Sequence, residues 1–255
     1  TMDGSSKIYS GESDLLIVGG QESMSRARHA YLSRTGEKKL GNNVFIDTLV
    51  NDGLTDAFSK EHMGITAENV SRRYTVTRQD QDQFAYQSYL KTYKAIKNNY
   101  YKNELIKSTY KDEVRKDTTL VKLGQLKAVF KKSGTVTAGN ASSLNDGASF
   151  LALASEKYIK SNKIRPIAKI LSWASSAGNP DYMGVTPITA IQKLMKKMGV
   201  NIGYFDLVEI NEAFAATSVA VQRSLKIDPN KLNIAGGAIA LGHPIGCSGA
   251  RIVTT

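Results

Sequence analysis

The chain has 255 residues, of which 41% are apolar and 22% charged, so it is expected to bury a full core and is not a disordered chain. Its single cysteine excludes an internal disulfide and a cysteine-rich zinc site, and a mean hydropathy of -0.28 without an apolar run near the roughly 18 residues of a membrane span predicts a soluble protein. The 34 Lys and Arg against 23 Asp and Glu leave a net charge of +11, which favours an anionic partner such as a nucleic acid, an acidic membrane face or a phosphate-rich small molecule.

The first residues predict a helix followed by a strand. Residues 2–10 are typical of the end of a helix that Gly11 stops, and residues 13–20 are typical of a buried parallel strand that leads into a loop. Thr1 is not an initiator, and the apolar residues 250–253 allow only one helical turn before the sequence stops. The sequence is therefore expected to be a fragment that is cut at both ends.

A zone of polar helices is predicted from about residue 25 to 137. Thr77 and Asp80 form a capping box in front of a helix that runs to Lys97. Residues 72–132 hold 15 Lys and Arg against six Asp and Glu, a net charge of +9. This charge is either an ordinary solvated helical surface or a surface that attracts a polyanion. Because no nucleic-acid-reading module is recognisable, a nucleic acid is not favoured.

Strands and helices alternate from about residue 147 onward. Strands are predicted at residues 148–154, 165–174, 207–210 and 232–234. Helices are predicted to begin at Ser155, at Thr186 with Pro187, and at Glu212, the last of them running to Ser224. This alternation predicts a layered α/β fold with a mostly parallel sheet.

A glycine-rich stretch, residues 233–249, surrounds His243, which directly precedes Pro244. Glycines permit close backbone approach, and a residue before proline is confined to extended conformations, so the imidazole is expected to be held in a fixed orientation with neighbouring N–H groups free. A histidine with its ordinary pKa of about 6.5 can deprotonate a thiol or donate a hydrogen bond to a thioester oxygen. The alternative is a structural histidine.

Asn211 and Glu212 directly follow the strand predicted at residues 207–210. The carboxyl end of a parallel strand is where α/β sheets place their chemistry, and an amide there can orient a water or an oxyanion. Alternatively, Asn211 merely N-caps the next helix, and Glu212 is favourable to the helix dipole.

Two more segments are candidates for ligand binding. Residues 134–147 are rich in Gly, Asn, Ser and Asp, and their small side chains would let a flat or extended ligand lie against the backbone. His62-Met63-Gly64 precedes a predicted helix and can face a ligand. Each segment can equally be a plain connection.

Seven segments together resemble the thiolase family, in the order in which that family has them. They are GGQESMS at 19–25, DGLTDAF at 52–58, HMGITAEN at 62–69, GTVTAGNAS at 134–142, LNDGAS at 144–149, NEAFA at 211–215 and GGAIALGHPIGCSGARIV at 236–253. Within the family, the sequence is most similar to the biosynthetic acetoacetyl-CoA type. The resemblance implies a layered α/β/α/β/α fold with mixed, mostly parallel sheets and an inserted loop domain. It divides the chain into 1–24, the end of the N-terminal half; 25–146, the loop domain that covers CoA; 147–177, the return to the N-terminal half; and 178–255, a truncated C-terminal half.

The resemblance also implies an acyltransferase that condenses two acetyl-CoA to acetoacetyl-CoA and CoA, or runs the reverse thiolysis, through an acyl-cysteine. His243 is then the base that activates that cysteine and polarises the thioester, and Asn211 holds a water in the same oxyanion hole. The residues implied to bind CoA are His62, Met63, Arg115, Phe130, Ala138, Ser142 and Phe214. No metal and no further cofactor is implied, and the basic segment 72–132 would attract the CoA phosphates.

Both catalytic cysteines of the family are missing. The acyl-accepting cysteine is expected before Thr1 and the second one beyond Thr255, so the fragment alone is expected to be inactive, and Cys247 is not expected to be a nucleophile. The alternative is a catalytically inactive, CoA-binding thiolase-like protein, while a ketoacyl synthase is disfavoured by the thiolase motifs around Asn211 and His243. The family implies a homotetramer or dimer, no nucleic-acid or membrane partner, and a cytoplasmic or mitochondrial location.

Overall fold

The computed structural model describes residues 1–31, 42, 44–106 and 114–255. The helices of these residues are α1 (Met2–Tyr9), α2 (Met63–Arg73), α3 (Arg78–Lys97), α4 (Leu120–Gly124), α5 (Glu156–Ser161), α6 (Thr186–Met198), α7 (Ala215–Leu225), α8 (Ala238–Leu241) and α9 (Ile245–Thr254). The strands are β1 (Leu15–Ser23), β2 (His29–Ala30), β3 (Ile46–Asp47) and β4 (Asp146–Ala154). Short 3-10 turns lie at Met24–Arg26, Tyr100–Asn103, Pro180–Val185 and Ile202–Tyr204, and a π-helical turn lies at Leu49–Gly53.

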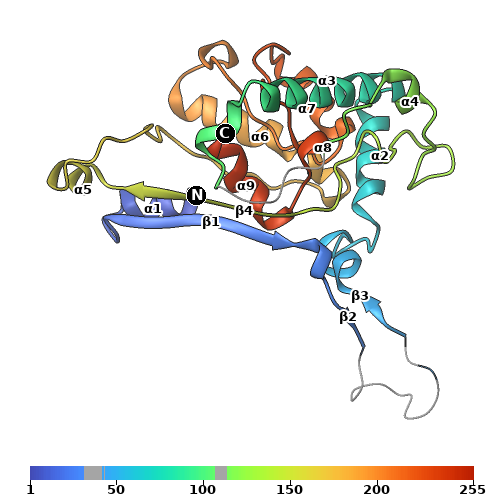
Figure 1. Cartoon of the computed structure of the whole chain (residues 1–255), viewed down its shortest axis with the longest axis horizontal. Coiled ribbons are helices and arrows are strands. Elements are labelled where there is room, and N and C mark those ends of the chain that lie inside the picture. The colour runs from blue at the N-terminus through green and yellow to red at the C-terminus, as the bar shows by residue number, and fades with distance from the viewer. Residues whose placement is uncertain (32–41, 43, 107–113) are drawn as a thin grey trace.

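β1 and β4 lie side by side although they are far apart in the chain, and α9 lies against the pair (Figure 1). The strands are antiparallel, and alternate residues of β1, among them Ile17, are exposed. The buried parallel strand predicted at residues 13–20 is therefore wrong in its burial and its pairing. Gly20 lies inside the strand and not in a loop. A glycine is needed there because a Cβ would lie 1.8 Å from the carbonyl oxygen of Gly246 in α9.

The helices predicted after Thr77, at Ser155 and at Thr186 are confirmed. The helix predicted from Glu212 begins only at Ala215, and residues 250–253, expected to form one turn, belong to the longer α9. The capping box is present: Asp80 N donates to Thr77 Oγ1 at 3.1 Å and Thr77 N donates to Asp80 Oδ2 at 2.9 Å, and α3 ends at Lys97. Ser155 caps α5 by accepting a hydrogen bond from Tyr158 N. The apolar stripe of α6 packs against a buried cluster that α2 and α7 share. Because α7 is buried along most of its length, it forms the centre of this helical layer.

Three of the predicted strands do not form ladders. Residues 165–174 are irregular and leave Ile167 and Leu171 exposed. Among the described residues no strand pairs with this segment, and an extended segment without a ladder partner is not a strand. The predicted strands at 207–210 and 232–234 form one isolated parallel bridge between Val208 and Leu232, and the Asn233 side chain continues the pairing on the Ile210 backbone. The ladders that the described residues form, β1–β4 and β2–β3, are both antiparallel.

Within the described ranges, no helix has both the length and the apolar composition that a membrane crossing requires.

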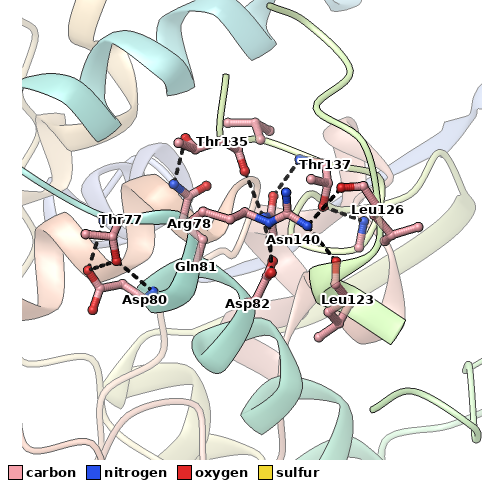
Figure 2. A network of polar contacts seen from close by, with 12 residues as sticks. Thr77, Arg78, Asp80, Gln81, Asp82, Leu123, Leu126, Thr135, Thr137 and Asn140 are labelled. Carbon is pink, nitrogen blue, oxygen red and sulfur yellow. Dashed lines mark hydrogen bonds and ion pairs between the residues drawn. The ribbon is translucent and has the colours of Figure 1, made fainter. Parts of the chain in front are cut away.

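A polar network fastens the loop before β4 to α3 (Figure 2). Asn140 Nδ2 donates to Asp82 Oδ1 at 2.9 Å and to the Thr135 carbonyl oxygen at 3.1 Å, while Asn140 Oδ1 accepts from Thr137 N at 2.8 Å. Arg78 Nε donates to the other carboxylate oxygen of Asp82 at 2.8 Å. Asp82 and Asn140 are buried, so water cannot replace a lost partner. The conformation of this loop therefore depends on the Asn140 amide.

Asn140→Ala is expected to lower the free energy of unfolding by about 2 to 4 kcal/mol, because Asp82 Oδ1, Thr137 N and the Thr135 carbonyl oxygen all lose the partner that Asn140 provides, and Arg78 contacts only the other oxygen of Asp82. Urea unfolding measures the change. Asn162→Ala is the matched control: this exposed amide makes one hydrogen bond to the Tyr158 carbonyl, so the loss should stay within about 0.5 kcal/mol. Equal losses in the two variants would contradict the role of the network.

Candidate functional site

A short segment with Ser142 and Ser143 brings two of the predicted loops together. Ser142 N and Ser142 Oγ both donate to the carbonyl oxygen of Ala213 at 3.0 Å, which fixes the stretch that follows Asn211. One residue further on, the Ser143 carbonyl oxygen accepts from His243 N at 3.2 Å. Asn211 and His243 are thereby held on either side of the same segment.

The side chains of Asn211 and His243 are in contact. Asn211 Nδ2 lies 3.3 Å from His243 Nε2 and 3.5 Å from His243 Nδ1. Gly242 lies between the end of α8 and His243, and its φ of +99° is in the region that favours glycine. This turn of the backbone places the imidazole beside Asn211. Asn211 Oδ1 is buried and has no hydrogen-bond partner among the described residues. This oxygen can accept a hydrogen bond from a water, so the pair combines a ring nitrogen with an amide in one small space.

The surroundings of His243 disfavour its charged form. Burial, and next the positive charge of Arg251, lower the pKa of His243 below its ordinary value of 6.5. The imidazole also lies just before the N-terminus of α9, where the helix dipole disfavours a cation. At neutral pH the ring is therefore uncharged and can accept a proton.

Asn211 does not cap the following helix, so that alternative is wrong. α7 begins only at Ala215, and its N-cap residue is Phe214, which leaves the Asn211 side chain free to face His243. Glu212 does not act on the dipole of this helix from its first turn either, since its side chain is fully buried and turns toward α3 and α8. The sequence pattern is that of a cap, but the chain continues for three more residues before the helix begins.

The N–H groups near His243 were expected to be free, but those of Gly242 and Gly237 are occupied. Gly242 N donates to the Ala238 carbonyl oxygen at 2.8 Å, and Gly237 N donates to Ser88 Oγ at 3.2 Å. They are occupied because residues 233–249 are not one open loop but include α8 and the first turn of α9. The backbone of this stretch serves to place the imidazole.

Three of the predicted ligand-binding side chains form an aromatic row. The rings of His62 and Phe130 stack with centroids 4.7 Å apart, and Phe130 meets Phe214 edge-on at 6.2 Å. His62 also caps α2, because its Nδ1 accepts from Gly64 N at 3.0 Å, and burial lowers the pKa of His62. The row ends at Phe214, which bridges to Ala141, the residue before the Ser142–Ser143 segment that holds the site.

The other predicted binding residues are placed less directly. Met63 is partly buried in the first turn of α2, and Ser142 uses its hydroxyl on the Ala213 carbonyl. Ala138 is exposed in the loop that the buried polar network fastens. Arg115 is exposed, and its carbonyl oxygen accepts from Thr118 Oγ1. Within the described residues, no recorded contact joins Ala138 or Arg115 to His243.

Sequence reasoning missed Ser248, Glu209 and Arg251. Ser248 Oγ lies 2.6 Å from His243 Nδ1, and its position one helical turn after Pro244 is a signal that the sequence does contain. Arg251 Nη1 lies 3.9 Å from Glu209 Oε2, one turn further along α9. Glu209 precedes Asn211 by two residues, a spacing that places two side chains on one side of an extended segment. Burial raises the pKa of Glu209 to about 7, although Arg251 opposes the shift.

Cys247 does not have the surroundings of a nucleophile. It is 3% exposed beneath β4, and burial raises the pKa of its thiol. The parts of the chain that the structure describes hold no group of three or more His, Cys, Asp and Glu side chains that could bind a metal ion.

The stability of the protein is expected to fall as the pH rises through about 7, because of Glu209. Its folded-state pKa of about 7 lies above the ordinary 4.5, so between these values the folded state holds a proton that the unfolded state has lost. This contribution is complete at low pH and disappears above pH 7. Glu209→Gln should flatten the dependence between pH 5 and 8 and stabilise the protein at pH 8 by about 1 kcal/mol, roughly 2 to 4 °C in Tm.

Urea unfolding at several pH values measures this effect. Glu12→Gln is the control, because Glu12 pairs with Lys7 on the surface and its loss should leave the pH dependence unchanged. A Glu209→Gln variant that keeps the wild-type slope would show that the carboxyl is already charged below pH 7.

Comparisons with known proteins identify the family of the chain. Two family models match: "Thiolase, N-terminal domain" at residues 1–157 and "Thiolase, C-terminal domain" at residues 164–255. The "Probable acetyl-CoA acyltransferase" of Staphylococcus aureus (strain COL) is 42% identical over 260 residues, which are 97% of this chain and 66% of that protein. The "Acetyl-CoA acetyltransferase" of Shinella zoogloeoides is 45% identical over 264 residues, 99% of this chain and 67% of that protein.

A solved structure is similar over the same extent. The crystal structure of human mitochondrial 3-ketoacyl-CoA thiolase in complex with CoA matches with a TM-score of 0.95 and 39% identity, over 99% of this chain and 66% of that chain. This likeness confirms the layered α/β fold. The chain spans about two thirds of the length of the relatives it matches.

Proposed function

Because the chain belongs to the thiolase family, we propose that it acts as an acetyl-CoA C-acetyltransferase, which condenses two acetyl-CoA to acetoacetyl-CoA and CoA or runs the reverse thiolysis. The observation that carries the proposal is the contact of 3.3 Å between Asn211 Nδ2 and His243 Nε2, in a site that keeps the imidazole uncharged. The name of the similar Shinella zoogloeoides protein supports acetyl-CoA as the substrate. No cofactor besides the CoA thioesters is proposed.

The residues of this site supply a base and an oxyanion hole. His243 Nε2 takes the proton of a cysteine thiol, and the resulting thiolate attacks the carbonyl carbon of acetyl-CoA. The tetrahedral oxyanion accepts hydrogen bonds from the protonated Nε2 and from a water held at Asn211. When the intermediate collapses, the acetyl group stays on the cysteine sulfur, and the CoA thiolate leaves with the proton of the imidazolium.

The acyl-accepting thiol of this proposal is not Cys247. Cys247 is the one cysteine of the chain, and it is buried beneath β4. The reaction therefore needs a cysteine that residues 1–255 do not contain. The same observation favours the second candidate, a thiolase-like protein that binds CoA without catalysis.

The aromatic row and the basic surface would hold the CoA. In the proposal, His62, Phe130 and Phe214 line the channel together with Met63, Ala138 and Ser142, and Arg115 contacts the nucleotide. Most of the described Lys and Arg of residues 72–132 are exposed, so their charge is available to the phosphates.

Domain division, assembly and location are proposals that rest on the family resemblance. We propose segments 1–24, 25–146, 147–177 and 178–255, and the pairing of β1 with β4 supports a return of the chain to the first unit near residue 147. A homodimer or homotetramer in the cytoplasm or the mitochondrion, without a nucleic-acid or membrane partner, is proposed on the same basis.

The proposal is tested by thiolysis of acetoacetyl-CoA. The protein expressed from its complete reading frame should turn over, and His243→Ala should lower kcat by roughly a thousandfold or more, because the base is removed. Residues 1–255 alone should bind CoA in a calorimeter but show no turnover. A decrease of kcat by less than about tenfold in His243→Ala would refute the role of His243 as the base. CoA binding without turnover by the complete protein would favour the second candidate.

The affinity for CoA is expected to fall as the salt concentration rises. CoA phosphates would lie within reach of the basic surface, and salt screens charges beyond about 8 Å at physiological ionic strength. At low salt, Lys131→Gln/Lys132→Gln next to Phe130 should weaken binding by about three- to tenfold. Lys157→Gln/Lys160→Gln on α5 removes the same charge outside the segment and should have no effect. Equal affinity at low and high salt would contradict a role of this surface in binding.

A further inference from the structure

The Ser248 hydroxyl lies between two fixed partners. Its Oγ is 2.6 Å from His243 Nδ1 and 3.0 Å from the carbonyl oxygen of Pro244. Ser248 is 4% exposed, so solvent does not compete for the hydroxyl. A hydroxyl has one proton to donate and lone pairs that accept. The arrangement therefore determines which group holds which proton.

One arrangement of the protons satisfies every group of this cluster. In it, the Ser248 hydroxyl donates to the Pro244 carbonyl oxygen at 3.0 Å, which also accepts from Cys247 N and Ser248 N. Toward His243 the Ser248 oxygen can then only accept, which requires that Nδ1 carries a proton. A neutral imidazole has one N–H, so Nε2 is left with its lone pair. The amide supports the same assignment, because Asn211 Nδ2 is a donor and lies closer to Nε2, at 3.3 Å, than to Nδ1, at 3.5 Å. The alternative, in which the hydroxyl donates to Nδ1, would leave a protonated Nε2 facing a second donor, Asn211 Nδ2.

The helix holds this hydroxyl in place. Ser248 follows Pro244, the N-cap residue of α9, by four residues, which is the spacing at which a serine in a helix bonds back to a carbonyl. The first turn of α9 lies directly on β1, because Gly20 lets Gly246 approach closely. The turn of α9 that carries Ser248 is thereby fixed on the sheet, and the bond to the Pro244 carbonyl oxygen fixes the hydroxyl on that turn.

From this geometry we propose that Ser248 is a positioning residue, whose hydroxyl keeps His243 in the tautomer with the proton on Nδ1, so that Nε2 is the atom that receives the thiol proton. The consequence for catalysis rests on the proposed function. When Nε2 takes the proton, the S–H bond breaks and the N–H bond forms. The Nδ1 proton stays on the ring and is donated to Ser248 Oγ throughout.

The tautomer is measured by long-range ¹H–¹⁵N correlation spectra of the ¹⁵N-labelled chain at a pH where His243 is neutral. The chain has three histidines, so His29→Gln and His62→Gln assign the signals of His243. The wild type should show a protonated Nδ1 and an unprotonated Nε2. A protonated Nε2 in the wild type would overturn the proposal without the need for any variant.

Three variants separate the hydroxyl from the packing around it. Ser248→Ala should move the ¹⁵N chemical shifts of Nδ1 and Nε2 toward the average of the two tautomers. Ser248→Thr, which keeps a hydroxyl, should restore the wild-type chemical shifts. Ser218→Ala is the matched control: this serine is also buried, and its Oγ has no partner among the described residues, so the spectrum of His243 should not change. A wild-type tautomer in a folded Ser248→Ala variant would overturn the proposal.

The catalytic effect is read in the thiolysis assay of the protein from its complete reading frame. Ser248→Ala should lower kcat by about ten- to a hundredfold with KM unchanged, and should alter the pH profile of kcat, while Ser248→Thr recovers activity. A variant with a higher KM and an unchanged kcat would contradict a positioning role. The spectra do not depend on turnover, so an inactive wild type would refute the proposed function and leave the tautomer assignment standing.

Discussion

One buried carboxylate holds together the parts of the chain that carry the site. Glu212 is 1% exposed and accepts hydrogen bonds from Ser88 Oγ in α3 at 2.6 Å, from Asn233 Nδ2 at 2.7 Å and from Ile239 N in α8 at 3.2 Å. Burial raises the pKa of this carboxyl, so each donor matters to the stability of its charged form. Asn211 directly precedes Glu212, and His243 follows α8, so these contacts fix both ends of the site.

The charges of the molecule are arranged around an uncharged base. Burial, the positive charge of Arg251 and the N-terminus of α9 disfavour the protonated form of His243. In the proposal, Ser248 keeps the single ring proton on Nδ1. The excess of Lys and Arg lies elsewhere, on the exposed surface of residues 72–132. The positive charge outside can attract an anionic substrate, while the base inside stays free to accept a proton.

Local signals are sufficient for several helices and for the strand predicted at residues 148–154, which is β4, but not for the pairing of the strands or for the other predicted strands. The capping box before α3 and the apolar stripe of α6 were predicted correctly, because caps and a 3.6-residue period are properties of neighbouring residues. Residues 165–174 have the composition of a strand but find no ladder partner among the described residues. β1 was expected to be parallel and buried, yet the strand that it meets, β4, is antiparallel and lies far along the chain.

The sequence by itself determined the types of residue that the site contains and the family to which their spacing points, because motifs such as those around Asn211 and His243 are short and local. It also determined that Cys247 is the one thiol of these 255 residues. Only the tertiary structure decided that Asn211 faces an imidazole and caps no helix, and that Ser248 binds the inner ring nitrogen. The first contact joins residues that are 32 apart in the chain, through packing that no local pattern encodes. The second depends on where that packing holds the imidazole, although the spacing of Ser248 from Pro244 is itself a local pattern.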